Sequence, residues 1–362
     1  MNTPPDSAAG QTTKPTIIDA NMHWLPETLF SDPRLLNKFL STPPREHGIE
    51  AVLRPIPDSD LREIVIEQPR GYPVLDYAEN NYDFEGQIAD MEKAGVSKAI
   101  LRLPCWQEWL DLEGCQMVND GLAAHMARAP DRFAAMVAVP PWGSDEMIRE
   151  AETRLAQPGF AGVQMAAHYG DLYLDDRAFR PFLKFLNDNR VPVVVHHTPL
   201  PVDFASLVPY TNVRRQMGRV FGQATAVSRE LFSGLFDELP DLRLSHSMLG
   251  GGFFAFVNML FPPQLDEFHD EVARFDDVTE HLHQQLRSNI FFDMSGAPQW
   301  GKAQLECAVA ALGESNIFYG GSYPIRRDWF FKGPAAIAAL DVPESTKTAL
   351  LGGNAQRFFG LG

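Results

Sequence analysis

The sequence predicts an α/β protein built as a single (β/α)8 barrel, and three observations lead to this prediction. The chain has 362 residues, a length that suits an α/β barrel with insertions. Short apolar strands alternate with helices along the chain, and eight strands can be counted from Ile17 onward. Polar side chains gather where these strands end, which is where such barrels carry their catalytic groups.

The first strand begins at Ile17 and runs directly into polar residues. In the stretch TIIDANMHWLP, Asp19, Asn21 and His23 alternate, so an extended backbone points all three to the same side. Burying such a row is costly unless its polar groups find partners. We therefore expect these side chains to meet others at the mouth of the barrel.

Two segments fall outside the regular alternation. Residues 1–15 are rich in Pro, Thr, Ser and Ala, and we expect them to be a disordered tail that precedes a barrel spanning residues 16–362. Residues 27–82 are Pro-rich and lack a regular pattern. This segment is too long for a simple connection, so we expect an irregular insertion over the barrel mouth.

The rest of the chain supplies the other strands and their helices. Strands are expected at residues 97–103, 133–139, 161–167, 191–197, 242–246, 289–294 and 316–319. Helices are expected at 84–94, 113–129, 145–156, 178–189, 221–239, 304–312, 335–340, 343–351 and 354–359. The β-branched run VPVVVHH is typical of a parallel strand buried on both faces.

Composition excludes several classes of partner. A formal charge of −16 argues against binding to nucleic acid or to an anionic membrane surface. No apolar run is long enough to cross a membrane. The cysteines Cys105, Cys115 and Cys307 form no CxxC pair, which fits a reducing cytoplasm and thiols that act as core residues.

Histidines are concentrated at the predicted strand ends. Five of the ten lie there, namely His23, His168, His196, His197 and His246. Arg102, Asp293, Ser295 and Ser322 follow other strands. Because these ends converge on one rim, the imidazoles predict a site for Zn²⁺, Fe²⁺ or Mn²⁺. Arg102 could clamp a substrate carboxylate through two hydrogen bonds.

Several motifs give the chain a specific resemblance. They are IIDANMHWLP, NDGLAAHMARAPDRFAAMVAVP, GFAGVQMAAHYGDLYLDDRAFRPF, VPVVVHHTP, LPDLRLSHSMLGGG, NIFFDMSG and NIFYGGSYP, in this order. Together they resemble the amidohydrolase superfamily, in the branch that contains aromatic acid decarboxylases and aminocarboxymuconate semialdehyde decarboxylase. The resemblance covers nearly the whole chain and implies a TIM barrel of the metal-dependent hydrolase type.

The resemblance also implies a ligand set, with two departures. His23 and His196 match metal-binding histidines, whereas Asn21 stands where the family has a histidine and Ser322 where it has an aspartate. Asn21 could offer its carbonyl oxygen, and His168 could supply a third imidazole. We expect Zn²⁺ first, with Mn²⁺ or Fe²⁺ as alternatives.

Three functions are compatible with these residues. The first is a metal-dependent enzyme that decarboxylates or hydrolyses a small aromatic or muconate-like acid, with His246 handling a proton and Arg102 holding the carboxylate. The second is a degenerate subunit that supports a homologous, oxygen-activating chain, because Asn21 and Ser322 weaken the ligand set. The third is a metal-free decarboxylase. We expect a homodimer or a hetero-oligomer with a homologous subunit.

Overall fold

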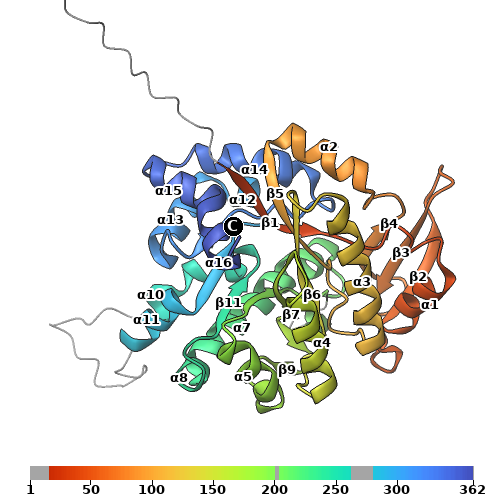
Figure 1. The fold of residues 1–362 in the computed structure, drawn as a ribbon, viewed down its shortest axis with the longest axis horizontal. Coiled ribbons are helices and arrows are strands. Elements are labelled where there is room, and N and C mark those ends of the chain that lie inside the picture. The colour runs from red at the N-terminus through yellow and green to blue at the C-terminus, as the bar shows by residue number, and fades with distance from the viewer. Residues whose placement is uncertain (1–15, 200–203, 262–279, 362) are drawn as a thin grey trace, which may run out of the picture.

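The protein was analysed as a computed structural model, which describes residues 16–199, 204–261 and 280–361. The tail predicted at residues 1–15 lies outside these ranges. Eight parallel strands form one sheet, and neighbours in the sheet follow the order of the chain (Figure 1). They are β1 (Ile17–His23), β5 (Val96–Arg102), β6 (Phe133–Ala138), β7 (Phe160–Ala166), β10 (Pro192–His196), β11 (Arg243–His246), β12 (Ile290–Asp293) and β13 (Ile317–Phe318).

The sheet closes on itself. Beyond β13, the backbone N–H of Ala20 donates to the carbonyl of Tyr319 at 3.0 Å, and that of Ser322 donates to the carbonyl of Asn21 at 2.8 Å. These bonds join the last strand to the first, so the sheet has no free edge. The predicted (β/α)8 barrel is thereby confirmed, with strand ends within one residue of most predicted bounds.

Helices surround the barrel (Figure 1). They are α2 (Phe84–Ala94), α3 (Leu112–Arg128), α4 (Asp145–Leu155), α5 (Arg180–Asp188), α6 (Phe204–Leu207), α7 (Gly218–Phe232), α8 (Leu235–Glu238), α9 (Met248–Gly252), α10 (Val257–Leu260), α11 (Glu280–Ser288), α12 (Ala297–Trp300), α13 (Lys302–Leu312), α14 (Arg327–Ala338), α15 (Glu344–Thr348) and α16 (Asn354–Phe359). None of them, within the described ranges, is both long and apolar enough to span a bilayer.

Two predicted helices have different bounds in the structure. The helix expected at 221–239 is divided into α7 and α8 by Gly234, whose φ of 75° interrupts the helical backbone. The helix expected from residue 335 begins at Arg327 instead, because Pro334 lies inside α14 rather than before it.

Two apolar clusters hold the layers together. The smaller fills the inside of the barrel at its N-terminal end, where Ile18, Ile100 and Val194 pack with Phe358 and Phe359 of α16. The larger lies between the strands and the surrounding helices. The C-terminal helix therefore plugs the bottom of the barrel and leaves its opposite end available for a site.

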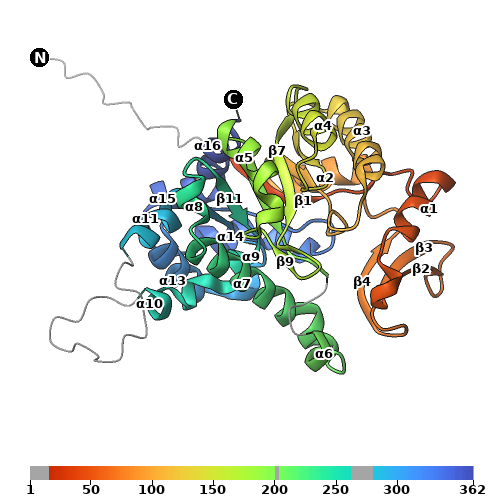
Figure 2. The same cartoon turned by 90° about the horizontal axis from the view of Figure 1, so that it is seen from below.

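The insertion is ordered, contrary to the irregular structure expected for it. It contains α1 (Pro33–Ser41) and an antiparallel sheet of β2 (Glu50–Pro55), β3 (Arg62–Glu67) and β4 (Pro73–Ala78). Figure 2 shows these elements at one side of the barrel. Arg219 Nη2 of α7 donates to the Val74 carbonyl of β4 at 2.6 Å, so the small sheet borders the barrel mouth.

Close packing of α9 on α7 yields a stability prediction. Gly251 has φ +67°, and a Cβ there would lie 1.9 Å from the Val220 carbonyl oxygen. We expect Gly251→Ala to lower the free energy of unfolding by about 3 kcal/mol or more, from backbone strain plus overpacking. Gly234→Ala is the control, because its φ is +75° but its nearest neighbour lies 3.6 Å away. Equal losses in urea titrations of the two variants would contradict the packing argument.

Candidate active site

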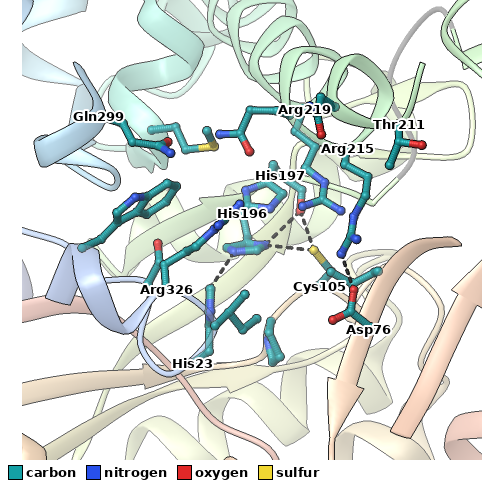
Figure 3. Close-up of a pocket in the computed structure, with 18 residues that line it drawn as sticks. His23, Asp76, Cys105, His196, His197, Thr211, Arg215, Arg219, Gln299 and Arg326 are labelled. Carbon is teal, nitrogen blue, oxygen red and sulfur yellow. Dashed lines mark hydrogen bonds and ion pairs between the residues drawn. The ribbon is translucent and has the colours of Figure 1, made fainter. Parts of the chain in front are cut away.

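A cavity of about 490 Å³ opens at the C-terminal end of the barrel strands (Figure 3). Strand ends, the insertion and the α7 region all contribute to its wall. Its lining residues are His23, Leu75, Asp76, Pro104, Cys105, His196, His197, Thr211, Asn212, Arg215, Gln216, Arg219, Met248, Gln299, Ser322, Ile325, Arg326 and Trp329. The cavity therefore lies where the sequence placed the site.

Two of the predicted histidines meet in this cavity. His23 ends β1 and His196 ends β10, and their Nε2 atoms lie 3.1 Å apart. His196 Nδ1 lies 2.9 Å from the carbonyl oxygen of His197, so Nδ1 carries a proton and Nε2 presents its lone pair toward His23. The backbone thus fixes the tautomer of His196.

Cys105 belongs to the site although the sequence analysis treated it as a core thiol. Its thiol donates to the His197 carbonyl oxygen at 3.3 Å, and its Sγ lies 3.6 Å from His196 Nδ1. Figure 3 shows Cys105 and His23 reaching His196 from different sides. Its position three residues beyond the end of β5 was the available signal.

The backbone around the cavity is strained at three strand ends. Positive φ angles occur at Cys105 (62°) and Trp106 (84°) after β5, at Met248 (57°) and Leu249 (54°) after β11, and at Ser322 (52°) after β13. Non-glycine residues rarely adopt this conformation, and such strain concentrates at functional sites. The strain marks the rim as a place shaped for function.

Burial and neighbouring charges keep the imidazoles neutral. Burial is the main cause that lowers the pKa of His23, His196 and His197 well below the usual histidine value. The positive charge of Arg102 adds to this lowering at all three rings, and that of Arg219 at two of them. At pH 7 the floor of the cavity therefore offers lone pairs and neutral N–H groups.

Arginines line the opposite wall, and the sequence analysis missed them. Arg215 pairs with Asp76 of the insertion, and Arg326 lies with its guanidinium carbon 5.2 Å from the Trp329 ring centre. Arg219 has no carboxylate partner among the described residues, and its buried Nε has no hydrogen-bond acceptor there. A guanidinium on a cavity wall that has no carboxylate partner and a free Nε donor can bind an anion.

Arg102, the predicted carboxylate clamp, lies beneath the cavity instead. Its side chain is 1 % exposed, and Nη2 donates to Asp293 Oδ2 at 2.7 Å while Nε donates to Asn21 Oδ1 at 2.7 Å. It does not line the cavity. The structure therefore does not support the prediction that Arg102 clamps the substrate, because Nε and Nη2 donate to acceptors beneath the cavity.

The side-chain oxygen and nitrogen of Asn21 also have hydrogen-bond partners beneath the cavity. Its only acceptor atom, Oδ1, receives the Arg102 hydrogen bond, and its Nδ2 donates to Asp293 Oδ2 at 3.1 Å and to Ser295 Oγ. The amide is engaged beneath the cavity and Asn21 does not line the cavity, so the structure does not support the prediction that its carbonyl binds a metal.

The sixth-strand histidine also differs from the prediction. His246 is fully buried, and its Nδ1 and Nε2 lie 2.7 Å from Gln223 Oε1 and from Glu230 Oε2, both on α7. It does not line the cavity. Its ring faces the helical layer, so the structure does not place it where it could exchange a proton with a substrate.

The two remaining predicted ligands differ in their position relative to the cavity. His168 lies on the short hairpin of β8 (His168–Tyr169) and β9 (Leu172–Tyr173), where Nε2 is 2.7 Å from Thr198 Oγ1 and Nδ1 is 2.9 Å from the Gly170 carbonyl. It does not line the cavity. Ser322 does line it, but offers a hydroxyl instead of a carboxylate.

The residues present do not make up a complete site for the divalent metal that the resemblance implies. Among the described residues, one group of three His, Cys, Asp or Glu ligand atoms lies within 4.8 Å, and it consists of Cys105, His196 and His197 without His23. His196 faces Cys105 through Nδ1, which already donates to a carbonyl. Within the described part of the chain, His23 Nδ1 is buried without a partner, whereas metal-binding histidines usually donate their second N–H.

Comparisons with known proteins find relatives over most of the chain. A family model described as Amidohydrolase matches residues 18–361. A 2-amino-3-carboxymuconate-6-semialdehyde decarboxylase of Dictyostelium discoideum is 24% identical over 257 residues, covering 70% of this chain and 68% of that protein. A gamma-resorcylate decarboxylase of a Rhizobium species is 28% identical over 303 residues, covering 75% and 85%.

The fold is shared with a solved decarboxylase. The 5-carboxyvanillate decarboxylase of Novosphingobium aromaticivorans, crystallised with manganese and a nitrobenzoic acid, has a TM-score of 0.72 and 20% identity. The alignment covers 98% of this chain and 100% of that one.

The buried contact between His246 and Glu230 generates a prediction. We expect His246→Ala to lower the free energy of unfolding by about 3–5 kcal/mol, because a buried carboxyl group loses its partner. The double variant His246→Leu/Glu230→Leu should regain much of that loss in urea titrations. A His246→Ala protein with wild-type stability and no turnover would instead return His246 to the reaction.

Burial of Asp19 makes the free energy of unfolding of the protein depend on pH. Its Oδ1 accepts the backbone N–H groups of Asn21 and Gly321, and Oδ2 has no partner among the described residues. Burial is the main cause that raises the pKa of Asp19 from 3.8 to about 6. The folded state therefore binds a proton more tightly than the unfolded state, and stability falls as pH rises from about 4 to 6.

Replacing Asp19 should remove this loss. We expect Asp19→Asn to gain about 3 kcal/mol over the wild type as pH rises from about 4 to 6.5, measured by urea unfolding. Asp60→Asn, at an exposed carboxylate, is the control. A constant difference between Asp19→Asn and wild type across this range would contradict the proposed proton uptake.

Proposed function

Because the chain belongs to the amidohydrolase family, we propose that it is a carboxy-lyase that releases CO₂ from a small aromatic or muconate-like acid. The observation that carries the proposal is the cavity at the barrel mouth, where neutral imidazoles face guanidinium groups. An acid of this kind offers a carboxylate to the arginines and a polarised ring to the imidazoles. The similarity to decarboxylases favours this reaction over hydrolysis.

Arg219 is the group best suited to hold a carboxylate. It lines the cavity, its Nη2 is fixed by the Val74 carbonyl of β4, and its Nε has no acceptor among the described residues. Arg326 stands at the exposed rim of the same cavity. An acidic substrate would therefore be attracted at the rim and fixed by Arg219, with the insertion helping to orient that guanidinium.

His197 is the imidazole that we assign to proton transfer. Both nitrogens of His196 have partners, whereas among the described residues His197 has one long polar contact through its ring, 3.5 Å from Nδ1 to Ser247 Oγ. A neutral imidazole can take the proton of a ring hydroxyl and return it to the ring carbon as the C–C bond to the carboxylate breaks. CO₂ leaves, and solvent restores the hydroxyl proton.

A screen in D₂O tests the reaction directly. The purified chain would be incubated with hydroxybenzoic, dihydroxybenzoic and muconate-type acids, and products would be followed by NMR. We expect product with deuterium on the carbon that lost the carboxylate, because the hydroxyl proton that His197 returns to the ring carbon has already exchanged with D₂O. Turnover by the chain alone would argue against a degenerate subunit; no turnover of any acid would argue against the proposed function.

Arg219→Gln should weaken substrate binding about 10- to 100-fold, the value of one or two charge-assisted hydrogen bonds. The effect is expected mainly in KM, measured by steady-state kinetics, because the same contact exists before and during the reaction. Arg229→Gln is the matched control on the same helix, since Arg229 pairs with Asp175 away from the cavity. Equal effects of the two variants would exclude Arg219 as the carboxylate site.

A further inference from the structure

We propose that the guanidinium of Arg102 has replaced the catalytic metal ion in this barrel, so that the chain acts on its substrate without a divalent cation. The activity part of this inference rests on the proposed carboxy-lyase function, and the metal-binding part does not.

Arg102 is adjacent to the histidine pair. The last residues of β1 and β5, His23 and Arg102, are register partners in the parallel sheet, and the Trp24 N–H donates to the Arg102 carbonyl at 2.8 Å. The charge of Arg102 acts on the imidazoles of His23 and His196. A divalent ion between these rings would therefore sit close to a permanent positive charge.

The guanidinium also contacts Asn21, one of the two altered ligand positions. Asn21 Oδ1 faces Arg102 Nε at 2.7 Å, and Asn21 Nδ2 donates to Asp293 and Ser295. To bind a metal, Asn21 would have to leave Arg102, which would then lose an acceptor in a site where it is 1 % exposed. The position is occupied by a satisfied network rather than left open.

The charge of Arg102 is already matched within the network. Asp293 Oδ2 accepts from Arg102, and Asp293 Oδ1 accepts from the backbone N–H groups of Met248 and Ser295 at 3.1 and 3.0 Å. The charge of Asp19 also acts on Arg102, although Asp19 does not line the cavity. Since Ser322 is not a carboxylate, a divalent ion at the histidine pair would have no carboxylate at that position to offset its charge.

Metal content and metal binding test the inference without a substrate. The full chain, purified without added metal, would be analysed by plasma mass spectrometry and titrated with Zn²⁺ and Mn²⁺ by calorimetry. We expect well below one ion per chain and no saturable binding at His23 and His196. One ion per chain that survives dialysis against a chelator and is lost in His23→Ala would overturn the inference.

A variant that gains metal binding tests the inference from the opposite direction. The double variant Asn21→His/Ser322→Asp restores both altered ligand types and removes the acceptor of Arg102, so it should bind one Zn²⁺ or Mn²⁺ more tightly than the wild type. Asn189→His, at an exposed position, controls for an added surface histidine. Equal metal affinity in the wild type and a folded double variant would contradict the role assigned to Asn21 and Ser322.

Activity distinguishes this inference from the proposed function. With an acid that the wild type decarboxylates, turnover should be unchanged after chelator treatment. Loss of turnover with recovery on adding Zn²⁺ or Mn²⁺ would overturn the metal-free inference while supporting the carboxy-lyase. Failure of every acid in the screen would count against the proposed function alone, because metal content is measured independently.

Discussion

The ion pair between Arg102 and Asp293 is the interaction on which the rest of the site depends. Arg102 Nη2 lies 2.7 Å from Asp293 Oδ2 inside the barrel, and both side chains are 1 % exposed. The contact links the ends of β5 and β12. Removing one member of such a pair leaves a buried charge and typically costs about 3–5 kcal/mol. The neighbouring polar groups are therefore arranged to keep the pair satisfied.

This constraint divides the mouth of the barrel into two levels. Beneath the cavity, Arg102, Asn21 and Asp293 form a closed network that has no direct access to a ligand. Above it, His197 and Arg219 line the cavity and keep hydrogen-bonding capacity for one. The lower level supplies position and charge, and the upper level is the one that a ligand in the cavity can contact.

The sequence was sufficient for the fold because the fold depends on a repeated pattern. Apolar strands and intervening helices recur along the chain. A strand end predicted one residue away, or a helix predicted to begin at residue 335 instead of Arg327, does not change the barrel. The sequence did not predict that the insertion forms a small sheet, because the antiparallel strands of this sheet lie among proline-rich turns. Its pairing depends on register between segments that have no local signal.

The site was harder to predict because a residue at a strand end can face either the barrel or the helices. His196 and His246 both end strands, yet His196 points into the cavity and His246 points toward α7. There the two ring nitrogens of His246 contact Gln223 and Glu230. The pairing of His246 with these residues depends on the rotation of α7, which the sequence pattern does not specify. Cys105 was assigned to the core on composition alone, although its position just beyond β5 was informative.

When a metal-ligand residue is replaced, the new side chain can either lack partners or join a new network. The two cases differ in whether a reverse substitution restores metal binding. If the new residue leaves an unfilled, unpaired site, a single reverse change restores binding. At Asn21 the substitution is instead accommodated by Arg102, whose two donors and charge are matched to Asn21 and Asp293. Restoring a metal ligand there disturbs a buried ion pair as well. The altered residue and its partner thus form one unit, and the chemistry of this barrel has to be interpreted from the pair.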